Sequence, residues 1–277
     1  MNDLFASRAE AAPMPARELR AYQAAAIDML RQSLARALQA YRDGVRTTVA
    51  RTMLEQPTGA GKTVVAAAIT RMARAKGKRV LFLVDAISLV DQTVERFAEW
   101  GIRDVGVIQA DHPMTNYAEP VQVASRQTLE QRGMPATDLV IVDEAHSMSE
   151  WLGAIMTSPD WAEVPFIGLS ATPWAKGLGN LYDDLLRPVT MQGLIDGGHL
   201  CPFRVFAAGH PDLTGVKTEA GDYKKDQLGK VMGDAQLVAD IVETYRLRGE
   251  KSRVGGGGKA DGSKPGNPFA RNGNRAR

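Results

Sequence analysis

The sequence predicts an α/β domain with a doubly wound, mainly parallel sheet, and three observations lead to this prediction. Short runs of Val, Ile and Leu recur along the chain and alternate with helix-forming stretches. These runs are apolar throughout, which is typical of strands that are buried on both faces of a parallel sheet. A glycine-rich loop at 57–63 joins the first of these runs to a helix-forming stretch. A sheet covered by helices on both faces is therefore expected.

The predicted elements follow one another along most of the chain. An alanine-rich helix is expected at about Leu19–Tyr41, because Ile27, Leu30, Leu34 and Leu38 recur at helical spacing. Strands are predicted at Val49–Leu54, Val80–Val84, Val105–Ile108, Val121–Ala124, Leu139–Val142, Phe166–Leu169 and, less regularly, Phe203–Ala207. Further helices are predicted at Thr63–Lys76, Ser88–Trp100 and Ala235–Arg248.

Composition divides the chain into three parts: a flexible N-terminal segment at 1–16, a domain at 17–250, and a glycine-rich basic tail at 251–277 that is expected to be disordered. The tail carries seven Lys or Arg residues against Asp261 alone, a net charge of +6. Because the whole chain carries +2, the remaining residues carry −4. Nucleic acid would therefore bind to the domain in a local groove and not through a broad basic field.

Several classes of protein are disfavoured by the residue counts. The single cysteine, Cys201, excludes a disulfide framework and a cysteine-rich zinc site. The four histidines show no metal-ligand spacing. No apolar run approaches the length of a membrane span, and the N-terminus has no hydrophobic signal region. A soluble, cytoplasmic protein is expected.

The strongest chemical signal is the glycine-rich loop. It comprises Pro57, Thr58, Gly59, Ala60, Gly61, Lys62 and Thr63. A turn of this kind between a strand and a helix surrounds phosphate groups with backbone N–H donors. Lys62 would reach the β and γ phosphates of ATP, and the Thr63 hydroxyl would bind Mg²⁺. Gln56 stands where the usual pattern begins with glycine; the alternative interpretation is a flexible connection.

A second signal is the sequence Asp143-Glu144-Ala145-His146 directly after the apolar run Leu139–Val142. Parallel sheets build their sites at strand carboxyl ends, so this segment should lie near Lys62. Asp143 would hold Mg²⁺ through water and Glu144 would polarise the attacking water. His146 is expected to couple this segment to its neighbours. An acidic pair after a strand is by itself also typical of a solvated loop, and His146 alone could be a surface histidine.

A third segment, Ser170-Ala171-Thr172-Pro173, again follows a buried run. Taken alone, these four residues would be interpreted as a turn. The hydroxyl groups of Ser170 and Thr172 could bond the acidic segment across adjacent strand ends and couple nucleotide state to movement.

The three segments in this order resemble motifs I, II and III of superfamily 2 helicases. The preceding Leu19-Arg20-Ala21-Tyr22-Gln23 resembles the adenine-recognising element of the DNA-translocating branch that includes restriction-enzyme motor subunits. The resemblance implies a RecA-like P-loop domain that binds ATP and Mg²⁺, with Gln23 and Arg20 at the adenine edge. Gln23 could otherwise be an ordinary glutamine on a helix surface.

Two further stretches are similar to the elements with which these helicases hold nucleic acid. Residues 88–92 resemble motif Ia, although Ala86 and Ile87 stand where that motif usually has an arginine. Residues 123–129 resemble motif Ib/Ic, in which a hydroxyl and backbone amides hold the strand. Gln92, Ser125 and Arg126 are the resulting candidates, through sequence-independent phosphate contacts; the alternative is that they are solvated residues at helix ends.

The resemblance implies that the connection to a second RecA-like domain starts after about residue 200. The chain departs from the family after about Arg248, where that domain would begin and the composition becomes glycine-rich. That domain supplies the arginine finger, typically worth about 10³–10⁵ in rate. The resemblance therefore implies binding of ATP and nucleic acid, very slow hydrolysis, and no unwinding by the chain alone. Three explanations are open: a second chain supplies the domain, the gene is truncated, or the domain has a regulatory role. The abrupt change in composition favours truncation.

The function predicted from the sequence is the ATP-binding half of a superfamily 2 DNA helicase or translocase. A non-catalytic module that binds nucleic acid and ATP is the alternative from another class. An RNA helicase fragment is a third interpretation, because the Asp-Glu-Ala-His motif alone does not separate DNA from RNA.

Overall fold

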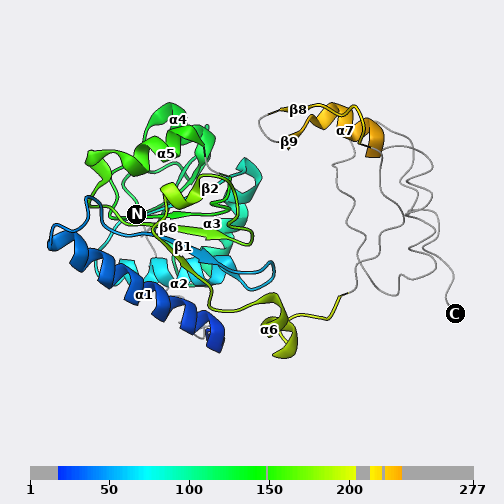
Figure 1. Cartoon of the computed structure of the whole chain (residues 1–277). Coiled ribbons are helices and arrows are strands. Elements are labelled where there is room, and N and C mark those ends of the chain that lie inside the picture. The colour runs from blue at the N-terminus through cyan, green and yellow to red at the C-terminus, as the bar shows by residue number, and fades with distance from the viewer. Residues whose placement is uncertain (1–17, 148, 204–212, 220–221, 233–277) are drawn as a thin grey trace, which may run out of the picture. The chain divides into compact units, whose positions relative to one another are not determined.

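The structure is a computed structural model of the whole chain, and it describes residues 18–147, 149–203, 213–219 and 222–232. The chain divides into two compact units, Met1–Cys201 and Pro202–Arg277. All the elements that position the candidate site belong to the first unit (Figure 1). In the described part of the chain no helix combines the length and the apolar character that a membrane span needs.

The first unit is built on a seven-stranded sheet with the strand order β3-β4-β2-β5-β6-β1-β7, and its strand pairs are parallel. The strands are β1 (Arg51–Glu55), β2 (Val80–Val84), β3 (Val105–Ile108), β4 (Val121–Ser125), β5 (Leu139–Val142), β6 (Phe166–Ser170) and β7 (Asp184–Leu186). Six of them match the predicted runs. Because β6 lies between β1 and β5, the loops that follow these three strands meet at one edge of the sheet.

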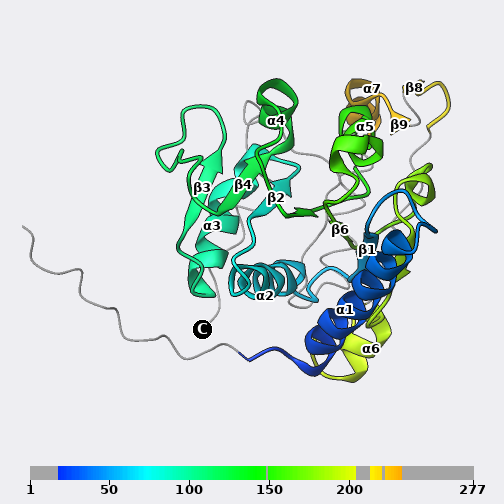
Figure 2. The same cartoon turned by 90° about the vertical axis from the view of Figure 1, so that its left-hand side faces the viewer.

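Helices cover both faces of the sheet, as Figures 1 and 2 show. One apolar cluster joins α1 (Ala21–Arg42), α2 (Lys62–Arg74) and α3 (Val90–Glu99) to one face. The other cluster joins α4 (Arg126–Arg132) and α5 (Glu150–Thr157) to the opposite face. Along β2, Val80, Phe82 and Val84 belong to the first cluster while Leu81 and Leu83 belong to the second. The predicted α/β, doubly wound, mainly parallel architecture is confirmed.

Some short elements were not predicted from the sequence. These are α4, α5, α6 (Met191–Asp196), β7 and the 3₁₀ turns Ile87–Leu89, Pro159–Trp161 and Leu178–Asn180. The helix predicted at Ser88–Trp100 begins with the first of these turns, so α3 itself starts at Val90. Strand β7 has three residues and is stabilised by parallel pairing with β1, which is a tertiary contact that local periodicity does not reveal.

The second unit is described over two short ranges. It contains the antiparallel pair β8 (Thr218–Glu219) and β9 (Asp222–Tyr223), followed by α7 (Lys225–Met232). Phe203 is not in a strand, and the rest of the strand predicted at Phe203–Ala207 lies outside the described residues. The predicted helix at Ala235–Arg248, the N-terminal segment 1–16 and the tail 251–277 also lie outside them.

Candidate nucleotide-binding site

The glycine-rich loop leaves the carboxyl end of β1 and enters α2 at Lys62. Gly59 and Gly61 have φ angles of +86° and +85°, a left-handed conformation that glycine adopts without a steric penalty. The Ala60 N–H donates to the Pro57 carbonyl at 3.0 Å and closes the turn. The loop therefore delivers its backbone to the N-terminus of a 13-residue helix, where the helix dipole favours a bound anion.

The start of α1 packs against this loop. Gln23 is buried; its Nε2 donates to the Ala60 carbonyl at 3.1 Å, and its Oε1 accepts the Arg20 N–H at 3.0 Å. The Tyr22 hydroxyl also donates to the Ala60 carbonyl, at 3.1 Å. The amide that the sequence assigned to adenine is thus bonded to the main chain of the loop, while Arg20 stays exposed.

The acidic segment lies opposite the loop, beyond the end of β5. Nζ of Lys62 is 2.9 Å from Oε1 of Glu144, so residues 82 positions apart in the sequence form an ion pair. The Asp143 N–H donates to the Leu83 carbonyl of β2, and the Ala145 N–H donates to the Leu169 carbonyl of β6. These backbone bonds fix the segment between its neighbouring strands, at the edge of the sheet where the loop lies.

A hydrogen-bonded chain connects this segment to the end of β6. Nδ1 of His146 lies 2.9 Å from Oγ of Ser170 and 3.4 Å from Oε2 of Glu144. Ser170 is fully buried, and its Oγ accepts the Thr172 N–H at 3.0 Å. The structure therefore brings together Lys62, Glu144, His146 and Ser170 in one network. The backbone N–H of Thr172 extends this network, whereas the side chain of Thr172 is exposed.

Two features of the acidic segment cost free energy. Glu144 has a φ of +46°, which is strained for a residue with a side chain. Burial, followed by the charge of the neighbouring Glu144, raises the pKa of Asp143 above its ordinary value, although Lys62 acts in the opposite direction. A cation beside Asp143 would stabilise its ionised form.

Asp143 and Thr63 could bind Mg²⁺ if the phosphate of a bound nucleotide supplied further ligands. Among the residues that the structure describes, no cluster of three His, Cys, Asp or Glu side chains could hold a metal ion. Mg²⁺ in phosphate-transfer sites normally takes one or two carboxylates, together with waters and phosphate oxygens. The Asp143 carboxylate and the Thr63 hydroxyl in the first turn of α2 match that donor set.

Gln56, at the junction of β1 and the loop, is fully buried. Its backbone N–H donates to the Ser170 carbonyl at 2.9 Å. Within the described residues, neither its Nε2 nor its Oε1 has a hydrogen-bond partner. The sequence marked Gln56 only as a departure from the usual pattern, whereas the structure shows a buried amide with unused hydrogen-bonding capacity beside the loop.

The three candidates for nucleic-acid contact differ in accessibility. Gln92 is exposed on α3. Ser125 is fully buried, and its Oγ lies 2.8 Å from Oγ1 of Thr128. The guanidinium of Arg126 pairs with Oδ1 of Asp85 at 2.5 Å and donates to the Ser147 carbonyl. Arg126 thus joins the end of β2 to the loop after the acidic segment.

The sequence analysis missed two residues beside the loop, His199 and Leu200. The His199 ring lies against the Tyr22 ring, and Leu200 packs on Gly59. No local pattern signals either contact, because 177 positions separate His199 from Tyr22.

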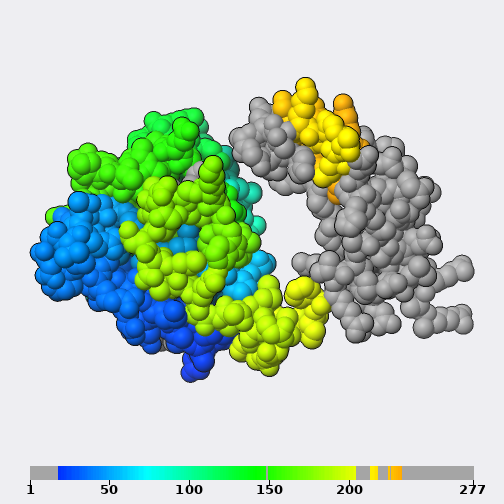
Figure 3. Space-filling model, viewed as in Figure 1, coloured from blue at the N-terminus to red at the C-terminus, as the bar shows by residue number. Residues whose placement is uncertain are grey.

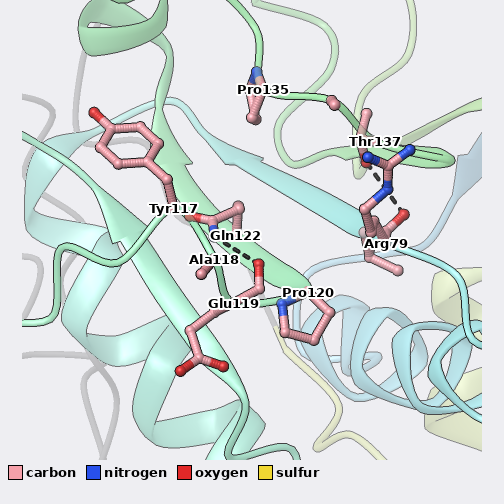
Figure 4. Close-up of a pocket in the computed structure, with 10 residues that line it drawn as sticks. Arg79, Tyr117, Ala118, Glu119, Pro120, Gln122, Pro135 and Thr137 are labelled. Carbon is pink, nitrogen blue, oxygen red and sulfur yellow. Dashed lines mark hydrogen bonds between the residues drawn. The ribbon is translucent and has the colours of Figure 1, made fainter.

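A cavity of about 350 Å³ lies away from this site (Figure 4). Arg79, Pro120 and Thr137 line it, and they stand just before β2, β4 and β5. It is therefore at the amino edge of the sheet, whereas the glycine-rich loop and the acidic segment are at the carboxyl edge.

Comparison with known proteins agrees with this geometry. Residues 16–174, more than half of the chain, match the family described as "Type III restriction enzyme, res subunit". The chain belongs to this family. The predicted resemblance to superfamily 2 helicases of the branch with restriction-enzyme motor subunits is thereby confirmed. Membership supports a helicase-type ATPase domain with a P-loop nucleotide site.

Similar individual proteins come from phages and an archaeon. A "51.5 kDa protein" of Lactococcus phage (isolate 7-9) is 30% identical over 201 residues, which are 70% of this chain and 40% of that protein. The UvsW helicase of bacteriophage T4 is 18% identical with a TM-score of 0.47, over 62% of this chain and 61% of that one. The Hef helicase domain of Pyrococcus furiosus is 22% identical with a TM-score of 0.41, over 59% and 39%. The chain thus spans less than two thirds of each.

Proposed function

We propose that this chain binds Mg²⁺ and ATP at the glycine-rich loop and serves as the ATP-binding half of a nucleic-acid-dependent superfamily 2 ATPase. The ion pair between Lys62 and Glu144, 2.9 Å long, carries the proposal. It brings the phosphate-binding loop and the acidic segment within reach of one triphosphate. A phosphate-binding loop, a carboxylate at the metal and a group that orients the attacking water are parts that phosphoryl transfer to water uses.

Each residue has a distinct role in this proposal. The backbone of Pro57, Thr58, Gly59, Ala60 and Gly61 and the Lys62 ammonium group hold the phosphates. Thr63 and Asp143 hold Mg²⁺, which neutralises developing charge on the phosphate oxygens. When phosphate binds, Lys62 exchanges Glu144 for the phosphate, and the released Glu144 carboxylate orients water for attack on the γ-phosphate. Arg20 contacts the adenine, and Gln23 does so by exchanging its bond to the Ala60 carbonyl or to the Arg20 N–H for the base.

His146, Ser170 and Thr172 form the coupling path in this proposal. Nδ1 of His146 lies within reach of both Glu144 and Ser170, so a change at Glu144 alters the Ser170–Thr172 link. Full turnover requires a positive charge opposite the leaving phosphate, which a second RecA-like domain would supply through its arginine finger. We therefore expect slow hydrolysis unless such a domain, from this or another chain, completes the site.

DNA is the proposed partner, through contacts of Gln92, Ser125 and Arg126 with its phosphate backbone. Gln92 is accessible as it stands, whereas Arg126 must exchange Asp85 or Ser147 for a phosphate. Ser125 is fully buried, so its hydroxyl must leave Thr128 and become exposed before it can contact DNA. RNA remains the alternative substrate. Competition between duplex DNA and RNA at a fixed salt concentration decides between them.

Lys62→Ala tests the proposal. Loss of the ammonium group removes charge-assisted bonds to phosphate, so the affinity for a fluorescent ATP analogue should fall by about 100-fold or more. Lys76→Ala, an exposed lysine just beyond the end of the same helix, is the matched control and should bind as the wild type does. Unchanged affinity in Lys62→Ala would remove the proposal. Steady-state hydrolysis with and without DNA then separates a DNA-dependent ATPase from a non-catalytic ATP-binding module.

A further inference from the structure

The chain that leaves α6 is held in a fixed conformation by a helix-ending motif. The Gly198 N–H donates to the Ile195 carbonyl at 2.9 Å, and the His199 N–H donates to the Leu194 carbonyl at 2.8 Å. This pair of bonds, with Gly198 in the left-handed region at a φ of +67°, defines a Schellman motif. Leu194 is fully buried and anchors the helix. The positions of His199 and Leu200 are therefore fixed by backbone bonds.

This motif places both residues on the glycine-rich loop. The ring of His199 lies 5.1 Å from the ring of Tyr22, whose hydroxyl donates to the Ala60 carbonyl at 3.1 Å. A Cβ added to Gly59 would lie 2.8 Å from Cδ2 of Leu200, so the two residues are in contact. In the space-filling view the segment around α6 lies beside the first turn of α1 (Figure 3). Two consecutive residues thus support two consecutive residues of the loop, one directly and one through Tyr22.

The loop conformation that Leu200 contacts leads directly into the N-terminus of α2, where a helix favours a bound anion. Gly59 and Gly61 are both in the left-handed region while Leu200 packs on Gly59. If phosphate binding and Leu200 packing both favour one loop conformation, each must strengthen the other, because coupling between two sites is reciprocal. Cys201 follows Leu200 directly, and the second unit begins at Pro202.

From these contacts we propose that His199 and Leu200 are positioning residues for the P-loop, and that nucleotide binding tightens their contact and is thereby transmitted to Cys201, the last residue of the first unit. This inference rests on the proposed function, since it requires nucleotide at the loop. It assigns to the exit of the domain a role that neither the motifs nor the family match contains.

Cys201 provides a reporter, because it is the only cysteine of the chain and is exposed. The rate of its modification by N-ethylmaleimide is measured in the full chain, with and without saturating Mg·ADP. A coupling of typical size predicts that nucleotide slows modification by about 5-fold. The affinity for a fluorescent ADP analogue is measured on the same samples.

Variants separate positioning from simple shielding of Cys201 by the nucleotide. Leu200→Ala and His199→Ala should each weaken nucleotide affinity by about 5-fold and abolish the nucleotide-dependent slowing. Leu200→Met keeps an apolar contact and His199→Phe keeps a ring. Each should therefore retain the nucleotide affinity and the nucleotide-dependent slowing of the wild type. Leu38→Ala removes the same atoms from an exposed site on α1 and should behave as the wild type. Urea unfolding verifies that every variant is folded.

The possible results have separate meanings. The inference is overturned if nucleotide still slows Cys201 modification in Leu200→Ala. It is also overturned if bound nucleotide leaves the modification rate of the wild type unchanged. In both cases the fluorescent analogue still binds, and the proposed function stands. If the wild type binds no nucleotide at all, the proposed function and this inference fail together.

Discussion

The two ends of β1 differ in whether their buried polar side chains have hydrogen-bond partners. At the amino end Arg51 is 3% exposed and donates to the carbonyls of Met156, Trp161 and Val164. Its guanidinium also lies 4.6 Å from the centre of the Phe166 ring. At the carboxyl end Gln56 is equally buried, but its amide has no partner among the described residues.

The same contrast extends along the two edges of the sheet. At the amino edge Asp138 bonds Arg79 through side chain and backbone, and these bonds lower the pKa of Asp138. At the carboxyl edge burial raises the pKa of Asp143, and the Glu144 backbone is strained. At the amino edge Arg51 and Asp138 are satisfied by the protein and stabilise the fold, although the Oε1 atom of Gln122 there has no partner among the described residues. Polar groups at the carboxyl edge hold unfavourable free energy that a ligand can offset.

The largest expected effect is on stability, in Arg51→Met. Burial lowers the pKa of Arg51 to about 10, so the guanidinium stays charged at neutral pH and its carbonyl partners depend on it. Removing it should lower the free energy of unfolding by about 3–5 kcal/mol in urea, while the ATP affinity of the folded protein stays unchanged. Arg36→Ala, whose side chain is 71% exposed, should change stability by less than about 0.5 kcal/mol. Equal effects of the two substitutions on the free energy of unfolding would mean that the hydrogen bonds of Arg51 do not stabilise the fold.

Gln56→Met should act in the opposite direction. The substitution removes a buried amide without partners and keeps an unbranched side chain of similar length, so the nucleotide-free protein should gain about 1 kcal/mol in urea unfolding. A loss of stability instead would mean that the amide is satisfied in solution, and the contrast between the ends of β1 would then be wrong.

A smaller, pH-dependent effect distinguishes Asp143 from Asp138. Because the folded pKa of Asp143 is raised, its ionisation costs stability once the pH exceeds the ordinary aspartate range. Asp143→Asn should therefore raise the melting temperature at pH 7 in EDTA, and this gain should vanish as the pH falls below that range. The folded pKa of Asp138 is lowered, so Asp138→Asn should lower the melting temperature at pH 7, again with no difference in acid. Shifts of the same sign at pH 7 would refute the assignment.

The smallest expected effect is on DNA affinity, and it concerns Arg126, whose guanidinium is paired with Asp85. Asp85 competes with phosphate for Arg126, so Asp85→Asn should raise DNA affinity by up to about 5-fold at low salt. Arg126→Ala should weaken binding and reduce the slope of log K against log salt by about one. If Arg126→Ala leaves the slope unchanged, Arg126 is a structural link between Asp85 and Ser147 and not a phosphate contact.

The sequence was a good guide wherever local pattern and burial agree. The runs Val80–Val84, Val105–Ile108 and Leu139–Val142 coincide with β2, β3 and β5, because strands buried on both faces must be continuously apolar. The phosphate loop was recognisable for a similar reason: a strand, a glycine-rich turn and a helix are contiguous in the chain. Helices α4, α5 and α6 have only six to eight residues, too few for their periodicity to be distinctive.

The sequence by itself determined six of the seven sheet strands, the family, and the place of the glycine-rich loop between a strand and a helix, since each depends on a short contiguous pattern. Only the tertiary structure decided that β6 separates β1 from β5 and that Lys62 pairs with Glu144. It likewise decided that Gln23 bonds the loop backbone and that Leu200 packs on Gly59. These contacts join residues tens to more than a hundred positions apart, and their formation depends on strand order and helix packing, which local sequence does not encode.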